Sequence, residues 1–228
     1  AIVLGRRRGF PQTAMLPHNM TMTVAGAAML WVGWFGFNAG SAVAADGVAG
    51  MAMLVTHISA AAGALMWMTV EWIRHGRPGA LGAVTGMVAG LGTITPASGF
   101  VGPMGALIIG ASAGFTCYWA TQLVKQRWVI DDSLDVFSVH GVGGALGMLL
   151  TSVFVMSSLG GAGLPEGVSL ASQFGVQALA VVATAAWSAL ISYLALKVAG
   201  AVVPLRVGVD EEIEGLDLVN HEERGYNF

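Results

Sequence analysis

Six long apolar runs dominate this chain of 228 residues and limit what it can fold into. The runs occupy residues 21–44, 48–72, 81–96, 101–124, 136–156 and 170–200. A helix needs about 20 apolar residues to cross a bilayer, so the runs predict six membrane-spanning helices. The third run is short, and the sixth is long enough to tilt or protrude. Only 10% of the residues are charged, against about 25% in soluble domains. We therefore expect an all-α polytopic membrane protein.

The basic residues predict how these helices are oriented. All ten Lys and Arg residues fall on one side of a six-span arrangement: Arg6, Arg7, Arg8, Arg74, Arg77, Lys125, Arg127, Lys197, Arg206 and Arg224. The loops on the other side hold Asp46 and Glu166 and no base. Because cytoplasmic loops carry the excess of Lys and Arg, both ends should be cytoplasmic in a plasma or inner membrane. The expected organisation is a cytoplasmic loop at 1–20, a helical bundle at 21–203 and an acidic cytoplasmic tail at 204–228.

Glycines spaced by four recur in three of the runs. They are Gly82, Gly86 and Gly90, then Gly110 and Gly114, and finally Gly143 and Gly147. Small residues on one helix face let two backbones approach closely, and this packing takes the place of the hydrophobic effect inside lipid. The spacing therefore predicts tight helix packing rather than a ligand site at these glycines.

One histidine stands alone in the fifth run. His140 is the only titratable side chain in the twenty residues that follow Asp135. An ionisable group at membrane depth indicates a functional site by default. Asp132 is expected to be the N-cap of this span, with Asp135 in the position of a capping-box acid. His140 would then lie about 7–8 Å further along the helix.

A second candidate site lies in the first run. Trp34, Phe37 and Ser41 are spaced by three and four, so they should share one helix face. An aromatic face attracts a small cation, and a hydroxyl accepts its hydrogen bond. The alternative is an ordinary packing or lipid-facing stripe, and the spacing does not decide between them. His57 in the second run is expected to be structural, with its ring N–H bonded to a backbone carbonyl.

Other kinds of chemistry find little support in the sequence. No His or Cys spacing is typical of a metal site, and no phosphate-binding loop is present. A hydrolase built from Ser138, His140 and Asp135 is a poor hypothesis, because Ser138 and His140 point to different sides of a helix. We therefore predict neither an enzyme nor a cofactor, and no nucleic acid as partner.

Four stretches together resemble the ammonium transporter (Amt/Mep) family. They are Gly-Trp-Phe-Gly-Phe-Asn-Ala-Gly-Ser at 33–41, Ile-Thr-Pro-Ala-Ser-Gly-Phe-Val at 94–101, Asp-Asp-Ser-Leu-Asp-Val-Phe-Ser-Val-His-Gly-Val-Gly-Gly at 131–144, and His-Glu-Glu-Arg-Gly-Tyr at 221–226. Their order and spacing match the family across nearly the whole chain. The resemblance implies eleven spans, built as two inverted five-helix halves and a long final helix. This chain is similar to spans six to eleven, so we expect an N-terminally truncated half.

The resemblance also implies roles for four pore residues. His140 resembles the second histidine of a pair inside the pore, and Trp34 a tryptophan of the pore wall. Phe37 resembles a phenylalanine that closes the outer entrance, and Ser41 a hydroxyl at the external ammonium site. The implied mechanism recruits ammonium through aromatic faces and the hydroxyl, removes a proton near the gate, and passes ammonia along imidazoles kept neutral by dry surroundings.

Further implications of the resemblance concern the cytoplasmic side. Asp132, Asp135 and Val136 fall at the inner end of the pore. The family forms homotrimers, and PII-type signalling proteins dock at the cytoplasmic face of many members. A simply solvated acidic tail is the alternative. The family pattern His-Gly-Glu is replaced here by a sequence with Glu222 in the glycine position. An ammonium sensor built on the same membrane core is the alternative to a transporter, and a structural bundle without transport is a third hypothesis.

Overall fold

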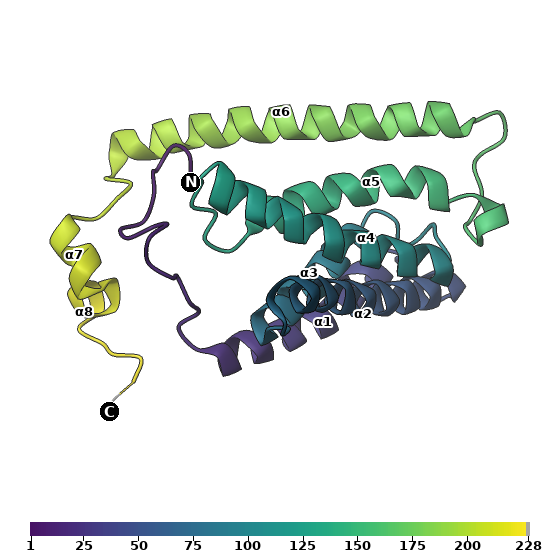
Figure 1. The fold of residues 1–228 in the computed structure, drawn as a ribbon. Coiled ribbons are helices and arrows are strands. Elements are labelled where there is room, and N and C mark those ends of the chain that lie inside the picture. The colour runs from purple at the N-terminus through teal and green to yellow at the C-terminus, as the bar shows by residue number, and fades with distance from the viewer. Residues whose placement is uncertain (227–228) are drawn as a thin grey trace.

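The computed structural model describes residues 1–226, and all of its regular secondary structure over that range is helical, as predicted. The six apolar runs form helices α1 Met20–Gly40, α2 Gly47–His75, α3 Ala80–Ile94, α4 Pro103–Gln122, α5 Val142–Phe154 and α6 Leu170–Val202 (Figure 1). Short helical segments η1 Leu123–Arg127, η2 Phe137–Gly141 and η3 Ser157–Leu159 join or extend them. The helices α7 Val209–Glu214 and α8 Leu216–His221 follow in the tail.

Five of the six expected spans are long and apolar enough to cross a membrane. The α5 span reaches that length only together with η2, which precedes it, whereas α4 is long enough by itself and η1 prolongs it. The sixth, α3, has only 15 residues, or about 22 Å of helix, which is less than a hydrocarbon core of about 30 Å. Turns at 95–100 follow the end of α3. They include Pro96, which has no amide hydrogen to continue the helical hydrogen bonding. Ala97, Ser98 and Val101 are buried, so this non-helical backbone lies inside protein.

Local sequence explains where several helices begin and end. Asn19 caps α1 by accepting a hydrogen bond from the Met22 amide at 2.9 Å, and Asp46 caps α2 through the amides of Val48 and Ala49. Gly76 ends α2 in the left-handed region at φ 75°. These caps satisfy amide and carbonyl groups that have no partner within the helix.

The core lies where α2, α3 and α4 pack against one another. One cluster joins Val55 to Ile94 and Ile109, and a second surrounds Trp67, Cys117 and other buried side chains. The glycines predicted to pack lie at these contacts. A side-chain carbon added at Gly90 or at Gly110 would collide with the Ser59 carbonyl, and one at Gly86 would collide with Trp67. The prediction of tight packing is confirmed for these positions.

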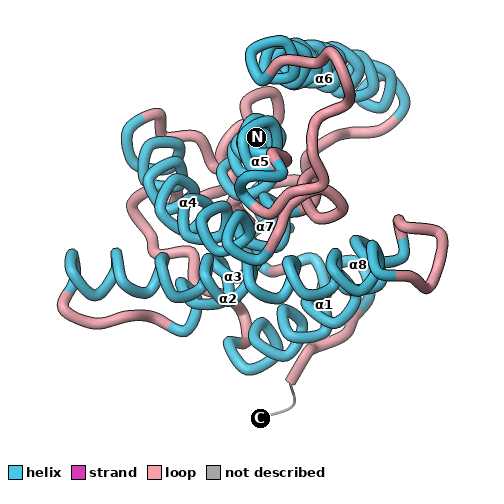
Figure 2. Tube along the Cα trace, turned by 90° about the vertical axis from the view of Figure 1, so that its right-hand side faces the viewer, coloured by secondary structure: helices cyan, strands magenta, loops and turns pink. Residues whose placement is uncertain are grey.

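The last long helix lies outside this core. Helix α6 packs along α5, and Figure 2 shows it standing apart from the other helices. None of its 33 residues is buried within this chain. Its length of about 50 Å exceeds the bilayer core, in line with the expectation that it tilts or protrudes. The N-terminal segment, the end of α6, and α7 and α8 gather at one end of the molecule (Figure 1).

The tail is folded into two short helices rather than simply extended. Glu222 ends α8 with φ 55°, a left-handed conformation that favours glycine over residues with a side chain. This conformation explains why the family pattern His-Gly-Glu has glycine at this position. Glu222 adopts the same left-handed conformation although it has a side chain.

Candidate functional site

Three aromatic side chains from two distant parts of the chain meet on one face of the bundle. Trp34 and Phe37 come from α1, and His140 comes from η2. The indole of Trp34 lies parallel to the imidazole of His140, with ring centroids 6.4 Å apart and planes 6° apart. The Phe37 ring meets the same indole edge-on at 5.9 Å. We call Trp34, Phe37 and His140 the ring cluster; the sequence predicted each of its members.

A threonine that the sequence analysis did not single out holds the ring cluster in place. Thr95, just after α3, accepts a hydrogen bond from the Trp34 Nε1–H at 2.8 Å. Its own hydroxyl donates to the Leu91 carbonyl at 2.8 Å. One turn along α1, the buried Asn38 donates in the same way to Thr56 of α2 at 2.9 Å. Two hydrogen bonds, four residues apart, therefore attach α1 to two different helices.

Ser41 lies one turn beyond Phe37 and is exposed. Its hydroxyl donates to the Phe37 carbonyl at 2.8 Å, so the hydroxyl hydrogen is committed while the oxygen can still accept a hydrogen bond. The shared face of Trp34, Phe37 and Ser41 follows from their helical spacing.

The ring cluster lies at the surface of these residues instead of inside them. Phe37 is 63% exposed, His140 is also exposed and Trp34 is half-buried. His140, which its apolar run led us to expect in buried surroundings, is therefore exposed in this chain taken alone. The physical reason is that α1 buries only Ala27 and Asn38 against the rest of the described chain, which leaves the far side of the cluster without a covering element.

The segment that carries His140 starts with an irregular turn. Residues Phe137–Gly141 form a π-helical turn before the regular helix α5. Such turns are rare and occur often at functional sites. Gly92 of α3 faces this turn, and a side-chain carbon added there would lie 3.5 Å from the His140 Nδ1. Glycine at this position leaves the imidazole room beside α3.

The two aspartates before this turn act differently from the predicted capping box. Asp132 does cap the helix start, but its carboxylate accepts from the amides of Val136, at 3.0 Å, and Phe137, at 2.9 Å, four and five residues later. Asp135 is not a capping-box partner. Its backbone has φ 56°, and its carboxylate instead lies 2.8 Å from the Lys125 Nζ. Because Asp135 has a left-handed backbone and precedes the first helical residue, Val136, it is not the third residue of the helix, as a capping box requires.

His57 also differs from its prediction. No hydrogen bond joins it to a backbone carbonyl within residues 1–226. Its ring instead contacts Trp31, with centroids 5.1 Å apart, and Phe35 at 5.9 Å. His57 therefore contacts other rings of α1 than those of the ring cluster.

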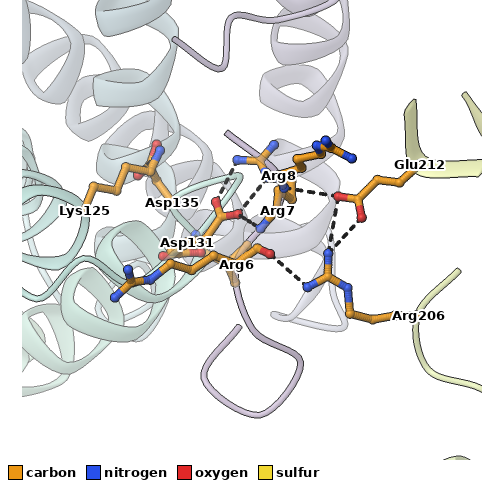
Figure 3. Close-up of polar contacts among 10 residues, drawn as sticks. Arg6, Arg7, Arg8, Lys125, Asp131, Asp135, Arg206 and Glu212 are labelled. Atoms are coloured by element: carbon orange, nitrogen blue, oxygen red, sulfur yellow. Dashed lines mark hydrogen bonds and ion pairs between the residues drawn. The ribbon is translucent and has the colours of Figure 1, made fainter. Parts of the chain in front are cut away.

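An arginine of the N-terminal segment binds the loop that precedes the fifth span. Arg7 binds Asp131 through Nε at 2.9 Å, through Nη2 at 2.7 Å and through its backbone amide at 2.7 Å (Figure 3). These hydrogen bonds, together with the positive charge, hold the pKa of the Asp131 carboxyl below its ordinary value. Burial acts in the opposite direction on Asp135 and raises its pKa, with Lys125 only partly compensating.

The tail joins the same group of charges. Arg206 binds Glu212 at 3.0 Å and also donates to the carbonyl of Arg6 at 2.8 Å (Figure 3). Glu212 in turn accepts a hydrogen bond from the Arg8 amide at 3.1 Å, and this bond is the main reason that its pKa is lowered. Three separate segments, the N-terminal segment, the loop before η2 and the tail, thus meet around Arg6, Arg7 and Arg8.

The Arg7–Asp131 pair predicts how stability responds to acid. Because the pKa of Asp131 is lowered in the folded state, its stabilising contribution is present above the ordinary aspartate pKa and is lost as pH falls through the lowered value. We expect this contribution to be about 1 kcal/mol, since water screens the half-exposed Arg7. Thermal midpoints measured from pH 7 downward should therefore fall less steeply for Asp131→Asn than for the wild type. Parallel profiles would contradict the prediction.

No group of three or more His, Cys, Asp or Glu side chains within residues 1–226 is arranged to hold a metal ion. What the described site offers is a set of aromatic faces, an imidazole and hydroxyl oxygens on spanning helices. These groups can attract a small cation and exchange hydrogen bonds with it.

Fold and site together define a polytopic α-helical membrane protein with an aromatic and histidine-containing face on its spanning helices. The model of the Ammonium Transporter Family matches residues 1–226, and the chain belongs to this family. It is 43% identical to an ammonium transporter of Bacillus subtilis and 44% identical to ammonium transporter Amt1 of Archaeoglobus fulgidus. Each alignment covers 99% of this chain, and 56% and 57% of those relatives. The chain therefore spans about half the length of the curated relatives it matches.

Solved structures agree with this assignment. A structure described as a sensor Amt protein matches 96% of the chain with a TM-score of 0.88 and 32% identity, over 55% of its own length. Mep2 of Candida albicans matches 92% of the chain with a TM-score of 0.80 and 32% identity, over 49% of its length. The predicted fold class and family are confirmed.

Proposed function

We propose that this chain supplies one half of a pore that conducts ammonium or ammonia across a membrane. The observation that carries the proposal is the ring cluster: an indole stacked on an imidazole, with a phenyl ring at its edge, on a face that no other described element covers. In the proposed pore, the other half of the protein covers this face. Family membership supports the substrate class.

The chemistry of the site suits this substrate. Ammonium is a small cation with four N–H donors, and the exposed Phe37 ring and half-buried Trp34 indole offer it cation–π attraction. Ser41 has an oxygen free to accept one of its hydrogen bonds, because the Ser41 hydrogen is already donated to Phe37. His140 lies parallel to the Trp34 indole, where its imidazole can accept a hydrogen bond from ammonia or donate one to it. In this arrangement the ion meets rings first and the histidine second.

Transport by the full-length gene product that contains these residues tests the proposal. The purified protein would be placed in liposomes, and uptake would be measured after adding ammonium or labelled methylammonium, with potassium as the comparison cation. We expect saturable uptake of ammonium and its analogue and none of potassium. Liposomes with correctly inserted protein that take up no more ammonium than empty liposomes would overturn the proposal.

Ammonium sensing is the second candidate, favoured by the TM-score of 0.88 to the structure described as a sensor Amt protein. The same liposome assay separates the two functions. A sensor would bind ammonium and change conformation without net uptake, whereas a transporter would carry it at every concentration at which it binds.

We also infer a cytoplasmic location for the N-terminal segment and the tail. The inference is supported by the gathering of both segments, with Arg6, Arg7, Arg8 and Arg206, at one end of the molecule. A homotrimer and a PII-type partner at this face follow from the resemblance to the family. Protease accessibility of the tail in oriented membrane vesicles tests the orientation, and cleavage only from the outside of intact cells would overturn it.

A further inference from the structure

Helix α1 carries two of the three ring-cluster residues but buries only Ala27 and Asn38 against the rest of the described chain. Its side chains form two hydrogen bonds to other spanning helices or their ends, from Trp34 to Thr95 and from Asn38 to Thr56. The first of these bonds fixes a ring that belongs to the ring cluster. The orientation of the Trp34 indole therefore depends on a residue that is not itself part of the ring cluster.

Thr95 is poised to act only as an acceptor toward Trp34. Its single hydroxyl hydrogen is donated to the Leu91 carbonyl at 2.8 Å, so its oxygen presents lone pairs to the indole N–H, also at 2.8 Å. An indole can only donate through its nitrogen. The hydrogen bond thus satisfies the one polar atom of Trp34, while the plane of the indole lies parallel to His140.

This arrangement has a consequence for what can bind beside Trp34. Ammonium has four donors and no lone pair, so a free indole N–H would offer it no hydrogen bond. Water and neutral ammonia do have lone pairs and would bind a free N–H. An indole whose N–H is already satisfied therefore presents a surface that attracts a cation through its π face and gives water no donor.

We propose that Thr95 is a positioning residue of the site: it fixes the Trp34 plane against His140 and withdraws the indole N–H from the face that meets the ion. The inference rests on the proposed function for its effect on transport, but the positioning itself is a property of the fold. The substitution that isolates it is Thr95→Val, which keeps the branched shape and removes the oxygen. Thr95→Ser restores the oxygen and is the conservative rescue.

The chain offers a matched control within α3, the helix that ends just before Thr95. Thr85 also donates its hydroxyl to the carbonyl four residues earlier, Leu81, at 2.8 Å, and accepts no hydrogen bond from a tryptophan. Thr85→Val therefore removes the same backbone hydrogen bond from α3 without touching Trp34. Any effect shared by the two valine variants reflects α3 itself, and any effect confined to Thr95→Val reflects the indole.

The test combines a spectroscopic readout with a transport readout in the full-length protein. Ultraviolet resonance Raman spectra report hydrogen bonding at indole N–H groups, and the difference between wild type and Trp34→Phe isolates this tryptophan from the others of the full-length protein. We expect Thr95→Val to shift the Trp34 band to that of an unbonded N–H, and Thr95→Ser and Thr85→Val to leave it unchanged. In liposomes, the ratio of ammonium uptake to osmotic water flux should fall roughly 3- to 10-fold for Thr95→Val alone, the equivalent of one ordinary hydrogen bond.

The outcomes separate this inference from the proposed function. An unchanged Trp34 band in Thr95→Val overturns the positioning role, whatever transport does. A shifted band with an unchanged uptake ratio overturns the link between the indole N–H and selectivity. If the wild type itself takes up no ammonium, the proposed function fails, while the Raman comparison still decides whether Thr95 sets the indole.

Discussion

Replacing Gly147 with alanine is expected to destabilise the folded protein by about 3 kcal/mol, the upper end for overpacking of a core. Gly147 lies in α5 against the end of α3, where the new methyl group would collide with the Thr93 carbonyl oxygen and lie 3.2 Å from the Pro96 ring. The carbonyl belongs to the backbone and cannot rotate away, so the two helices must separate. The thermal midpoint in detergent or liposomes measures the loss.

Gly144 provides the matched control for this prediction. It lies three residues earlier on the same helix, and a side-chain carbon there would meet no atom within 4 Å. Alanine favours a helix over glycine by up to about 1 kcal/mol, so Gly144→Ala should leave stability unchanged or raise it slightly. Equal destabilisation by the two substitutions would show that the close approach of α5 and α3 is not what makes glycine necessary at 147.

Substituting His140 with leucine should reduce ammonium uptake at least 10-fold while leaving the fold intact. The imidazole makes no hydrogen bond within residues 1–226, and its described ring contact is the stack on Trp34. Leucine fills similar space but has no nitrogen to exchange a hydrogen bond with ammonia. The loss should therefore appear in transport and leave the thermal midpoint nearly unchanged. Uptake by the full-length protein in liposomes is the measurement.

His57→Leu is the control for this second prediction. His57 is also an exposed histidine on a spanning helix, but it contacts Trp31 and Phe35 rather than the ring cluster. We expect uptake by this variant to stay within about twofold of the wild type, since His57 is not part of the ring cluster on which the proposed pathway rests. Unchanged uptake in a correctly inserted His140→Leu variant would remove His140 from the proposed pathway.

Much of the fold could be predicted because lipid imposes one strong rule on a sequence. Every backbone group in a bilayer must be hydrogen-bonded, so each long apolar run becomes a helix. The rule does not determine at which residue each helix ends or where a helix departs from regular α-helical geometry. The third run extends to Pro96 in sequence, whereas α3 ends at Ile94, and nothing in the apolar pattern indicates the π-helical turn of η2.

The site was predictable where it depends on helical spacing. Trp34 and Phe37 share a face because they are three residues apart, and a lone histidine in an apolar run is conspicuous. Thr95 lies in one of the stretches that resemble the family, but its role was not found because its hydrogen bond to Trp34 links residues 61 positions apart, and helical spacing gives no sign of such a contact. The exposure of His140 was missed for a related reason, since it depends on which helices cover α1.

The π-helical turn of η2 fixes how many residues separate the Asp132 cap from the glycines that face α3. Each residue of a helix advances the side chains by about 100°, so deleting one residue from Phe137–Gly141 would turn the cap and Val136 by that angle relative to Gly143 and Gly147. Either Asp131 would then lose its ion pair with Arg7, or Gly143 and Gly147 would lose their close contact with Thr93. The segment is thus constrained in its length as well as its composition, and an insertion or deletion here would be tolerated less well than most substitutions.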